Sequence, residues 1–248
     1  MVQRLISGLV IAALGWLGAA NGLAADRRAM EADGQTNIMP VHWDQASAKI
    51  IAHPDKARLE RGEVLCEIKK IDPQIVAAQT VGLIKADPAE CFQIVRKYNQ
   101  YVQLMPGTVE NRVIRSFKLE GDYAGAEAVD FWTRIRVLGF DVCYLLRIAH
   151  LSDPQSNLFR SFWTLVDNPS QVVGVCGSGK TPCENDLARN LGSHQFEPYP
   201  GNPTYTLHTY TVNLIGKNWL QRVAIQLGGQ KKMQEVTQGI RKALVPKE

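Results

Sequence analysis

The chain has 248 residues, of which 45% are hydrophobic, 21% charged and 8% aromatic, and its formal net charge is +4. This composition excludes a disordered chain, a collagen-like fibre and a membrane protein with many spans, and the length suits one large domain or two small ones. The basic residues are scattered and form no stripe that could follow a nucleic-acid backbone, so we expect no nucleic-acid partner.

The N-terminus has the pattern of an export signal. Arg4 is followed by an apolar run from Leu5 to Ala20, which ends in small residues. A positive start, an apolar centre and a small-residue exit predict a cleaved signal peptide over residues 1–25. The run is shorter than the ~20 residues that a membrane-spanning helix needs. We therefore expect a periplasmic or secreted protein; an N-terminal membrane anchor is the alternative.

Export would allow disulfide bonds, and an odd number of cysteines, five, leaves at least one unpaired. Cys176 and Cys183 bracket a turn-rich segment that can bring its ends together, so they are the expected disulfide. Cys143 lies in an apolar stretch and Cys91 at a helix start, where a thiol acts as a small hydrophobic group. Neither the cysteines nor the histidines have the spacing of a metal site, so no metal is expected.

The first elements after the signal form an N-terminal extension, residues 26–74, with a short helix within 43–59 broken at Pro54 and an edge strand over 63–71. A strand is predicted over 75–84. Asp87, Pro88 and Glu90 then match a capped helix start, with an acidic N-cap, proline at the first helical position and a second acid three residues after the cap.

A run of strands follows, rich in β-branched and aromatic residues and separated by Gly, Asp and Pro: 112–119, 126–137, 141–151, 158–166, 194–199 and 205–213. Residues 168–192 read as a loop insertion. In 126–137, apolar residues such as Val129 and Phe131 alternate with Asp130, Arg134 and Arg136, which predicts one buried and one solvated face. A helix is predicted over 217–244. Antiparallel strands with helices at the two ends indicate an α+β fold.

Three stretches carry a family resemblance. Residues 81–90 look like a first strand running into a helix, residues 98–106 (YNQYVQLMP) resemble a "D-Y-x-x-Y-x-x-(F/W)-M-P" motif with Asn99 near the expected acid, and residues 215–220 look like the start of a C-terminal helix. They resemble the START/Bet v 1-like (SRPBCC, helix-grip) superfamily, of the polyketide cyclase/dehydrase and coenzyme-Q-binding START type. The resemblance implies a START-like domain over 75–248, with a curved antiparallel sheet wrapped around a long C-terminal helix and an apolar cavity between them.

The cavity implied by this resemblance would be closed by a gate at Tyr101, Met105 and Pro106. No catalytic residue is assigned, and no cofactor is expected. The residues expected to bind the ligand are Phe131, Ile135, Tyr144, Leu146, Phe162, His208, Tyr210, Trp219, Val223 and Leu227.

The leading hypothesis is an exported, non-catalytic START-like protein that binds an apolar molecule, such as a phospholipid, a quinone or a sterol-like lipid, for transport or shielding, with transient membrane contact. The alternative is a cyclase/dehydrase-type enzyme or hydrolase in the same cavity, which a converging polar pair such as His208 with Tyr144, or an inward Arg, would favour. A third reading is a cavity-free envelope interaction protein, which predicts aromatic side chains filling the centre and an exposed apolar patch.

Overall fold

The structure, a computed structural model, describes residues 37–70, 75–137, 139–167, 184–217 and 219–245, and over 219–229 it describes the helical backbone alone. Three sequence predictions lie outside this part: the signal peptide over 1–25, the pairing of Cys176 with Cys183, and the side-chain positions of Trp219, Val223 and Leu227. Within the described residues, no helix is both long and apolar enough to cross a bilayer.

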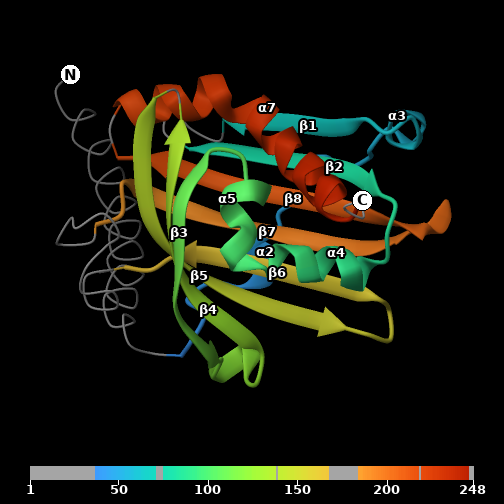
Figure 1. Ribbon diagram of the computed structural model, residues 1–248, viewed down its shortest axis with the longest axis horizontal. Coiled ribbons are helices and arrows are strands. Elements are labelled where there is room, and N and C mark those ends of the chain that lie inside the picture. The colour runs from blue at the N-terminus through green and yellow to red at the C-terminus, as the bar shows by residue number, and fades with distance from the viewer. Residues whose placement is uncertain (1–36, 71–74, 138, 168–183, 218, 246–248) are drawn as a thin grey trace, which may run out of the picture.

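In the described residues, eight antiparallel strands form one open, curved sheet in the order β1-β2-β8-β7-β6-β5-β4-β3 (Figure 1). The long helix α7 (Trp219–Ala243) crosses its concave face together with α4 (Pro88–Val95) and α5 (Tyr101–Leu104). This α+β arrangement is the helix-grip fold that the sequence predicted. The strands are β1 (Val64–Lys70), β2 (Val76–Ile84), β3 (Thr108–Lys118), β4 (Glu127–Val137), β5 (Phe140–Asp153), β6 (Leu158–Leu165), β7 (Leu187–Tyr199) and β8 (Asn202–Gly216).

Most elements begin and end close to where the sequence places them, but β7 is the exception. It starts at Leu187, so the loop predicted over 168–192 ends earlier than expected. The residues concerned, from Leu187 to Gly192, are polar or small in large part, yet they pair with β8 on one side. Tertiary pairing overrides the weak strand propensity of this stretch.

Helix α4 forms where its capping residues predict it. The Asp87 carboxylate accepts a hydrogen bond from the Ala89 backbone N–H (2.8 Å), and the Glu90 carboxylate accepts one from Asp87 N–H (3.3 Å). Its apolar face, including Phe92, packs against Phe196 of β7 and the end of α7. The helix thereby closes one end of the concave face.

Two short helices and the segment before them cover part of the convex face of the sheet. Helix α2 (Trp43–Ala46) lies behind the sheet in Figure 1, and Trp43 packs edge-on against Phe162 of β6. Helix α3 (Lys56–Glu60) packs its buried Leu59 beside β1 and β2. Gln79, on this same face, accepts hydrogen bonds from the backbone N–H groups of Ile50 (3.1 Å) and Ile51 (2.8 Å).

This cover corrects the prediction that the second face is solvated. Asp130 and Arg147 are 0% and 2% exposed and form an ion pair (Nε to Oδ1, 2.9 Å) beneath the N-terminal segment. Arg147 Nη2 donates to Asp130 as well (3.3 Å), Arg115 donates a further charge-assisted hydrogen bond to Asp130 (2.6 Å), and Arg147 Nη1 donates to the Ile38 carbonyl (2.8 Å). The charges are buried because residues 37–46 lie over them.

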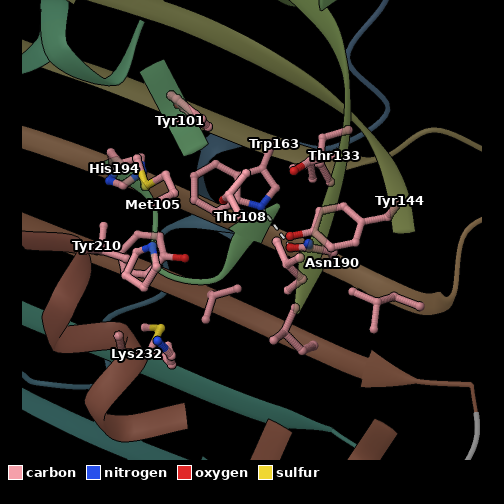
Figure 2. Close-up of a pocket in the computed structure, with 18 of the residues that line it drawn as sticks. Tyr101, Met105, Thr108, Thr133, Tyr144, Trp163, Asn190, His194, Tyr210 and Lys232 are labelled. Atoms are coloured by element: carbon pink, nitrogen blue, oxygen red, sulfur yellow. Dashed lines mark hydrogen bonds between the residues drawn. The ribbon is translucent and has the colours of Figure 1, made fainter. Parts of the chain in front are cut away.

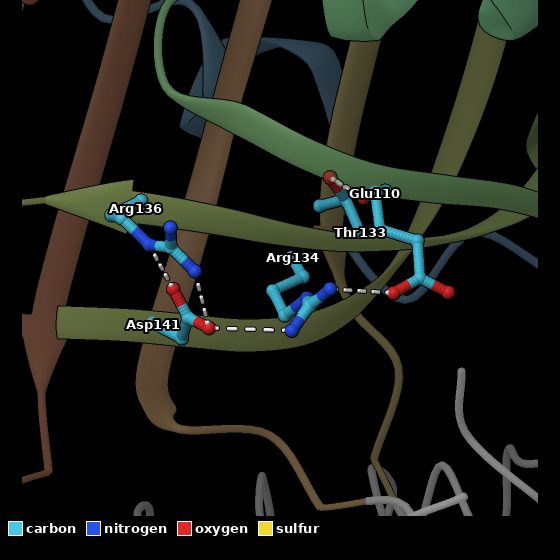
Figure 3. A network of polar contacts seen from close by, with 5 residues as sticks. All are labelled: Glu110, Thr133, Arg134, Arg136 and Asp141. Carbon is cyan, nitrogen blue, oxygen red and sulfur yellow. Dashed lines mark hydrogen bonds and ion pairs between the residues drawn. The ribbon is translucent and has the colours of Figure 1, made fainter. Parts of the chain in front are cut away.

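The prediction of a solvated face is correct at the β4–β5 hairpin. Arg134 donates to Glu110 (2.9 Å) and Asp141 (3.3 Å), and Arg136 makes two hydrogen bonds to Asp141 (2.7 and 3.1 Å), as Figure 3 shows. Neither guanidinium enters the concave side of the sheet. The hairpin is also tied to the turn after α5, because Arg136 N–H donates to the Gly107 carbonyl (2.7 Å).

Two glycines, one on α7 and one on β2, allow helix α7 to pack closely against its neighbours. A Cβ atom at Gly239 would lie 2.3 Å from the Leu104 carbonyl oxygen of α5, and one at Gly82 of β2 would lie 3.0 Å from Thr237 Cγ2. Any larger residue at Gly239 would separate α7 from α5, whereas one at Gly82 would require the Thr237 side chain to shift by a few tenths of an ångström. The position of α7 against α5 therefore depends on the absence of a side chain at Gly239.

Candidate functional site

A cavity of about 230 Å³ lies between the concave face of the sheet, helix α7 and the turn after α5 (Figure 2). All eight strands contribute to its lining, and α7 contributes Lys232, Met233 and Val236. Most of the lining side chains are apolar, from Ile68 on β1 to Ile148 on β5. A concave, mostly apolar space with a few polar groups is the usual form of a small-molecule site. The cavity-free reading of the sequence therefore does not describe this fold.

The structure places many of the predicted ligand-binding residues in this lining. The strand alternation seen in the sequence put them on the inner face, and the turn at 105–107 brings the gate residues over the same space. The predicted residues that line the cavity are Phe131, Ile135, Tyr144, Leu146 and Tyr210, together with Tyr101, Met105 and Pro106 of the gate.

Two predicted residues do not line the cavity. Phe162 is buried on the convex face, among Ala149, Trp43 and Tyr123, because its neighbours Ser161 and Trp163 point inward. Strand β6 carries aromatic and polar residues on both faces, so alternation could not reveal its orientation. His208 lies on the concave side but is covered by Thr237 of α7, one layer behind the cavity wall.

Sequence reasoning missed the polar lining residues on β5, β6 and β7. Ser161, Trp163, His150, Asn190 and His194 face the cavity, although none was assigned to it. The signal that could have found them is cross-strand pairing: Ser161 lies opposite both His150 on β5 and His194 on β7. Finding these pairs requires the register of three strands, which composition does not give.

His150 links the cavity wall to a tyrosine behind it. Tyr98 Oη lies 2.6 Å from His150 Nε2, and His150 Nδ1 lies 2.8 Å from Ser161 Oγ. Tyr98 is buried, and within the described residues its hydroxyl has only His150 as hydrogen-bond partner. The hydroxyl must therefore donate to Nε2, which leaves the ring proton on Nδ1 and makes His150 a donor to Ser161.

A second hydrogen-bonded chain connects the cavity to helix α7. His194 Nδ1 lies 3.0 Å from His208 Nε2, and His208 Nδ1 lies 3.0 Å from Thr237 Oγ1. The His194 ring also stacks on Tyr210, with ring centroids 4.7 Å apart. Figure 2 shows His194 and Tyr210 side by side in the cavity wall.

The histidines at this end of the cavity are neutral. Burial lowers the pKa of His150 and of His194 to about 3, and it lowers the pKa of His208 well below its usual range. Burial also raises the pKa of Tyr210 to about 12, so this hydroxyl stays protonated. The inner end of the cavity offers hydrogen bonds but no charge.

The other end of the cavity has its own polar group. Trp163 Nε1 donates to Asn190 Oδ1 (3.0 Å), and the pKa of Tyr144 is raised by burial although a hydrogen bond with Asn190 opposes the shift. Asn190 and His194 are four residues apart on β7, which corresponds to roughly 13 Å along a strand. The cavity therefore has two polar ends separated by an apolar middle.

Lys232 is the cationic residue that α7 adds to the lining, and its Nζ is paired with Glu235 (2.9 Å). Its side chain is 47% exposed, so it lies where the cavity meets solvent. Within the described part of the chain, no group of three His, Cys, Asp or Glu side chains could hold a metal ion.

Solved structures of human proteins have the same fold. The StarD13 (DLC2) lipid transfer and protein localization domain matches with a TM-score of 0.53 at 10% identity, over 75% of this chain and 86% of that one. STARD10 matches with 0.51 at 9% identity (77% and 80%), and StAR-related lipid transfer protein 5 with 0.50 at 13% identity (72% and 86%). No protein-family model and no curated protein matches the sequence.

The chain therefore has the START/Bet v 1-like helix-grip fold, as the sequence resemblance predicted. Its concave face, α7 and the turn after α5 enclose an apolar cavity in the position where this fold was expected to have one.

Proposed function

We propose that the protein binds an apolar small molecule or lipid in this cavity and transports or shields it. The observation that carries the proposal is the cavity itself, a space of about 230 Å³ with mostly apolar walls. Burying apolar ligand surface there would contribute roughly 25 cal/mol per Å². The fold similarity to domains named for lipid transfer supports the same conclusion. A phospholipid, a quinone and a sterol-like lipid are the ligand classes we propose to test.

Binding is favoured over catalysis by the direction of the hydrogen bonds. A hydrolytic serine needs a histidine nitrogen that accepts its proton, whereas His150 Nδ1 carries a proton and donates it to Ser161. A histidine with a pKa of about 3 is also a poor proton carrier near neutral pH, because general acid–base catalysis works best when the pKa is close to the operating pH. The arginines of the hairpin lie outside the cavity and cannot orient a substrate in it.

We also propose that the protein is exported and works in the periplasm or outside the cell, where an insoluble molecule needs a carrier. The signal-like residues 1–25 support this. Transient membrane contact is proposed at the gate. Val102 on α5 and Phe140 at the start of β5 are 49% and 53% exposed, and each lies next to a lining residue, Tyr101 and Val137 respectively.

The test begins with the mature protein purified gently from its native envelope. Native mass spectrometry followed by solvent extraction should reveal one bound apolar molecule per chain. Binding of a neutral apolar dye, N-phenylnaphthylamine, and its displacement by candidate lipids would then be measured. A protein that is empty when purified and binds neither dye nor lipids would contradict the proposal.

Two matched variants separate binding from stability. Phe131→Ala removes a phenyl ring from the cavity wall, and Phe162→Ala removes one from the convex face. Each truncation of a buried Phe costs about 3–5 kcal/mol of folding free energy. Only Phe131→Ala should alter ligand retention, and equal retention in both would count against the cavity.

A further inference from the structure

The cavity holds a pair of hydrogen-bond donors whose direction follows from the network behind them. Thr237 Oγ1 has only His208 Nδ1 as a hydrogen-bond partner within the described residues. Its hydroxyl is buried and must donate, so it donates to His208 Nδ1. The proton of the neutral His208 ring is then on Nε2, and it is donated to His194 Nδ1. The proton of the neutral His194 ring is left on Nε2.

Ser161 provides the second donor by the same reasoning. Its Oγ accepts the Nδ1 proton of His150, so its own hydroxyl proton is available for another acceptor. Both Ser161 and His194 line the cavity, and they are directly opposite each other on β6 and β7. Opposite residues on one face of an antiparallel pair have Cβ atoms about 4.5–5.5 Å apart. Two side chains whose Cβ atoms are this close can both direct a donor to one oxygen atom between them, at the usual ~2.7–3.2 Å from each donor.

We propose that the Ser161 hydroxyl and the His194 Nε2–H group together bind a carbonyl oxygen of the ligand at the inner end of the cavity. The proposal rests on the proposed function and makes it more specific: the ligand has an apolar body and a neutral carbonyl group. A carbonyl oxygen has two lone pairs and can accept two hydrogen bonds. It therefore needs two donors and no acceptor beside them.

The same geometry disfavours a charged headgroup at this end. The His150, His194 and His208 rings are neutral, so a carboxylate or phosphate placed there would lose its hydration without gaining a counter-charge. Lys232 lies at the solvent side of the cavity and is already paired with Glu235. An anionic ligand would therefore have to place its charge near Lys232 and solvent, and not between Ser161 and His194.

The test compares two probes of equal shape: a nine-carbon methyl ketone and the alkene in which a CH2 group replaces the ketone oxygen. The quantity measured is the ratio of their dissociation constants, alkene over ketone. The free energy of removing each probe from water is the same for every variant. It therefore cancels when the ratio is compared between variants. The double variant Ser161→Ala, His194→Phe should lower the ratio about fivefold or more, since each lost hydrogen bond contributes roughly 0.5–1.5 kcal/mol.

Ser193→Ala is the control, because it removes a buried hydroxyl from the convex face, where Ser193 lies opposite Phe162 and outside the cavity lining. It should leave the ratio unchanged. A second measurement needs no variant: the infrared carbonyl stretch of the carbon-13-labelled ketone should shift to lower frequency when it binds the wild-type protein, as hydrogen bonding requires. A fatty acid anion of the same length should bind without dependence on Ser161 and His194.

The outcomes separate the two proposals. If both probes bind, and neither the ratio nor the stretch responds, the carbonyl site is wrong while the apolar cavity stands. If neither probe binds and the dye also fails, the proposed function is wrong. If the fatty acid anion binds more tightly than the ketone and loses affinity in the double variant, the donors recognise an anion, and the neutral-carbonyl assignment is overturned.

Discussion

Replacing Gly239 by Ala tests whether the contact between α7 and α5 keeps the cavity closed. The new Cβ would lie 2.3 Å from the Leu104 carbonyl oxygen, and Cβ contacts below 3.0 Å are essentially never found. The two helices must therefore separate by roughly 0.7 Å, because a backbone carbonyl cannot turn away as a flexible side chain could. Met105 and Pro106 of the gate follow directly after Leu104, so they would move with it.

Two effects of opposite sign act in this variant. Ala is favoured over Gly in a helix interior by about 1 kcal/mol, whereas overpacking costs about 1–3 kcal/mol. We expect the clash to win and the free energy of unfolding to fall by about 1 kcal/mol, which lowers Tm by about 2–4 °C in a protein of this size. The rate at which the bound dye leaves the cavity should rise, because the gate is held less closely against α7.

The assay combines urea unfolding with stopped-flow release of N-phenylnaphthylamine. Gln238→Ala is the matched control, since Gln238 is the exposed neighbour of Gly239 on α7. It should change neither stability nor release rate by much. A Gly239→Ala protein that is more stable than the wild type, with unchanged dye release, would refute the reasoning, since it would mean that helix propensity outweighs the contact and that the gate does not depend on it.

Three further predictions concern the sheet. Asp130→Ala removes the carboxylate that neutralises the buried Arg147 guanidinium and should cost about 3–5 kcal/mol in urea unfolding, whereas Glu127→Ala, at exposed ion pairs, should cost under about 1 kcal/mol. Burial lowers the pKa of His194 in the folded protein to about 3. As pH falls, this histidine is therefore protonated in the unfolded chain before it is protonated in the folded protein. Stability is therefore full above pH 6.5 and falls as pH decreases toward 3, by up to about 1.4 kcal/mol per pH unit for each such histidine. Gly192→Ala would put a Cβ 2.4 Å from the Trp163 ring and 2.5 Å from the Thr211 carbonyl, so it should destabilise the fold and weaken dye binding.

Each of these has a clear contrary result. Equal losses for Asp130→Ala and Glu127→Ala would show that the buried pair adds nothing beyond a surface pair. Urea midpoints that stay constant between pH 7 and pH 5, the range above most carboxylate titration, would contradict the neutral assignment of the histidines. A His194→Phe variant should show a shallower pH dependence than the wild type. Normal dye affinity in Gly192→Ala would mean that Trp163 can move without disturbing the cavity.

The sequence was most informative where one face of a strand is apolar and the other polar. In β4 the alternation placed Phe131 and Ile135 on the inner face, and both line the cavity. It failed in β6, because the N-terminal segment covers the convex face and the strand has aromatic residues on both faces, so the prediction that Phe162 lines the cavity is wrong. Periodicity can orient a strand only when one of its faces remains in water.

The hydrogen-bonded chains at the inner end of the cavity could not be predicted, for a different reason. Tyr98 and His150 are 52 residues apart, and His208 and Thr237 are 29 apart. Each hydrogen bond depends on the register of the strands and on the rotation of α7. Neither quantity follows from residue type, whereas the capped start of α4 did, because all of its interactions lie within four residues.

The cover on the convex face also constrains the order of folding. Residues 37–46 are synthesised before every strand, yet their contacts are made to residues far along the chain: Ile38 to Arg147, 109 residues later, and Trp43 to Tyr123, 80 residues later. Such distant contacts have a high loop-closure cost and form late. Residues 37–46 therefore cannot complete these contacts until the middle strands have formed. A chain that starts at β2 would lack the segment that covers the convex face.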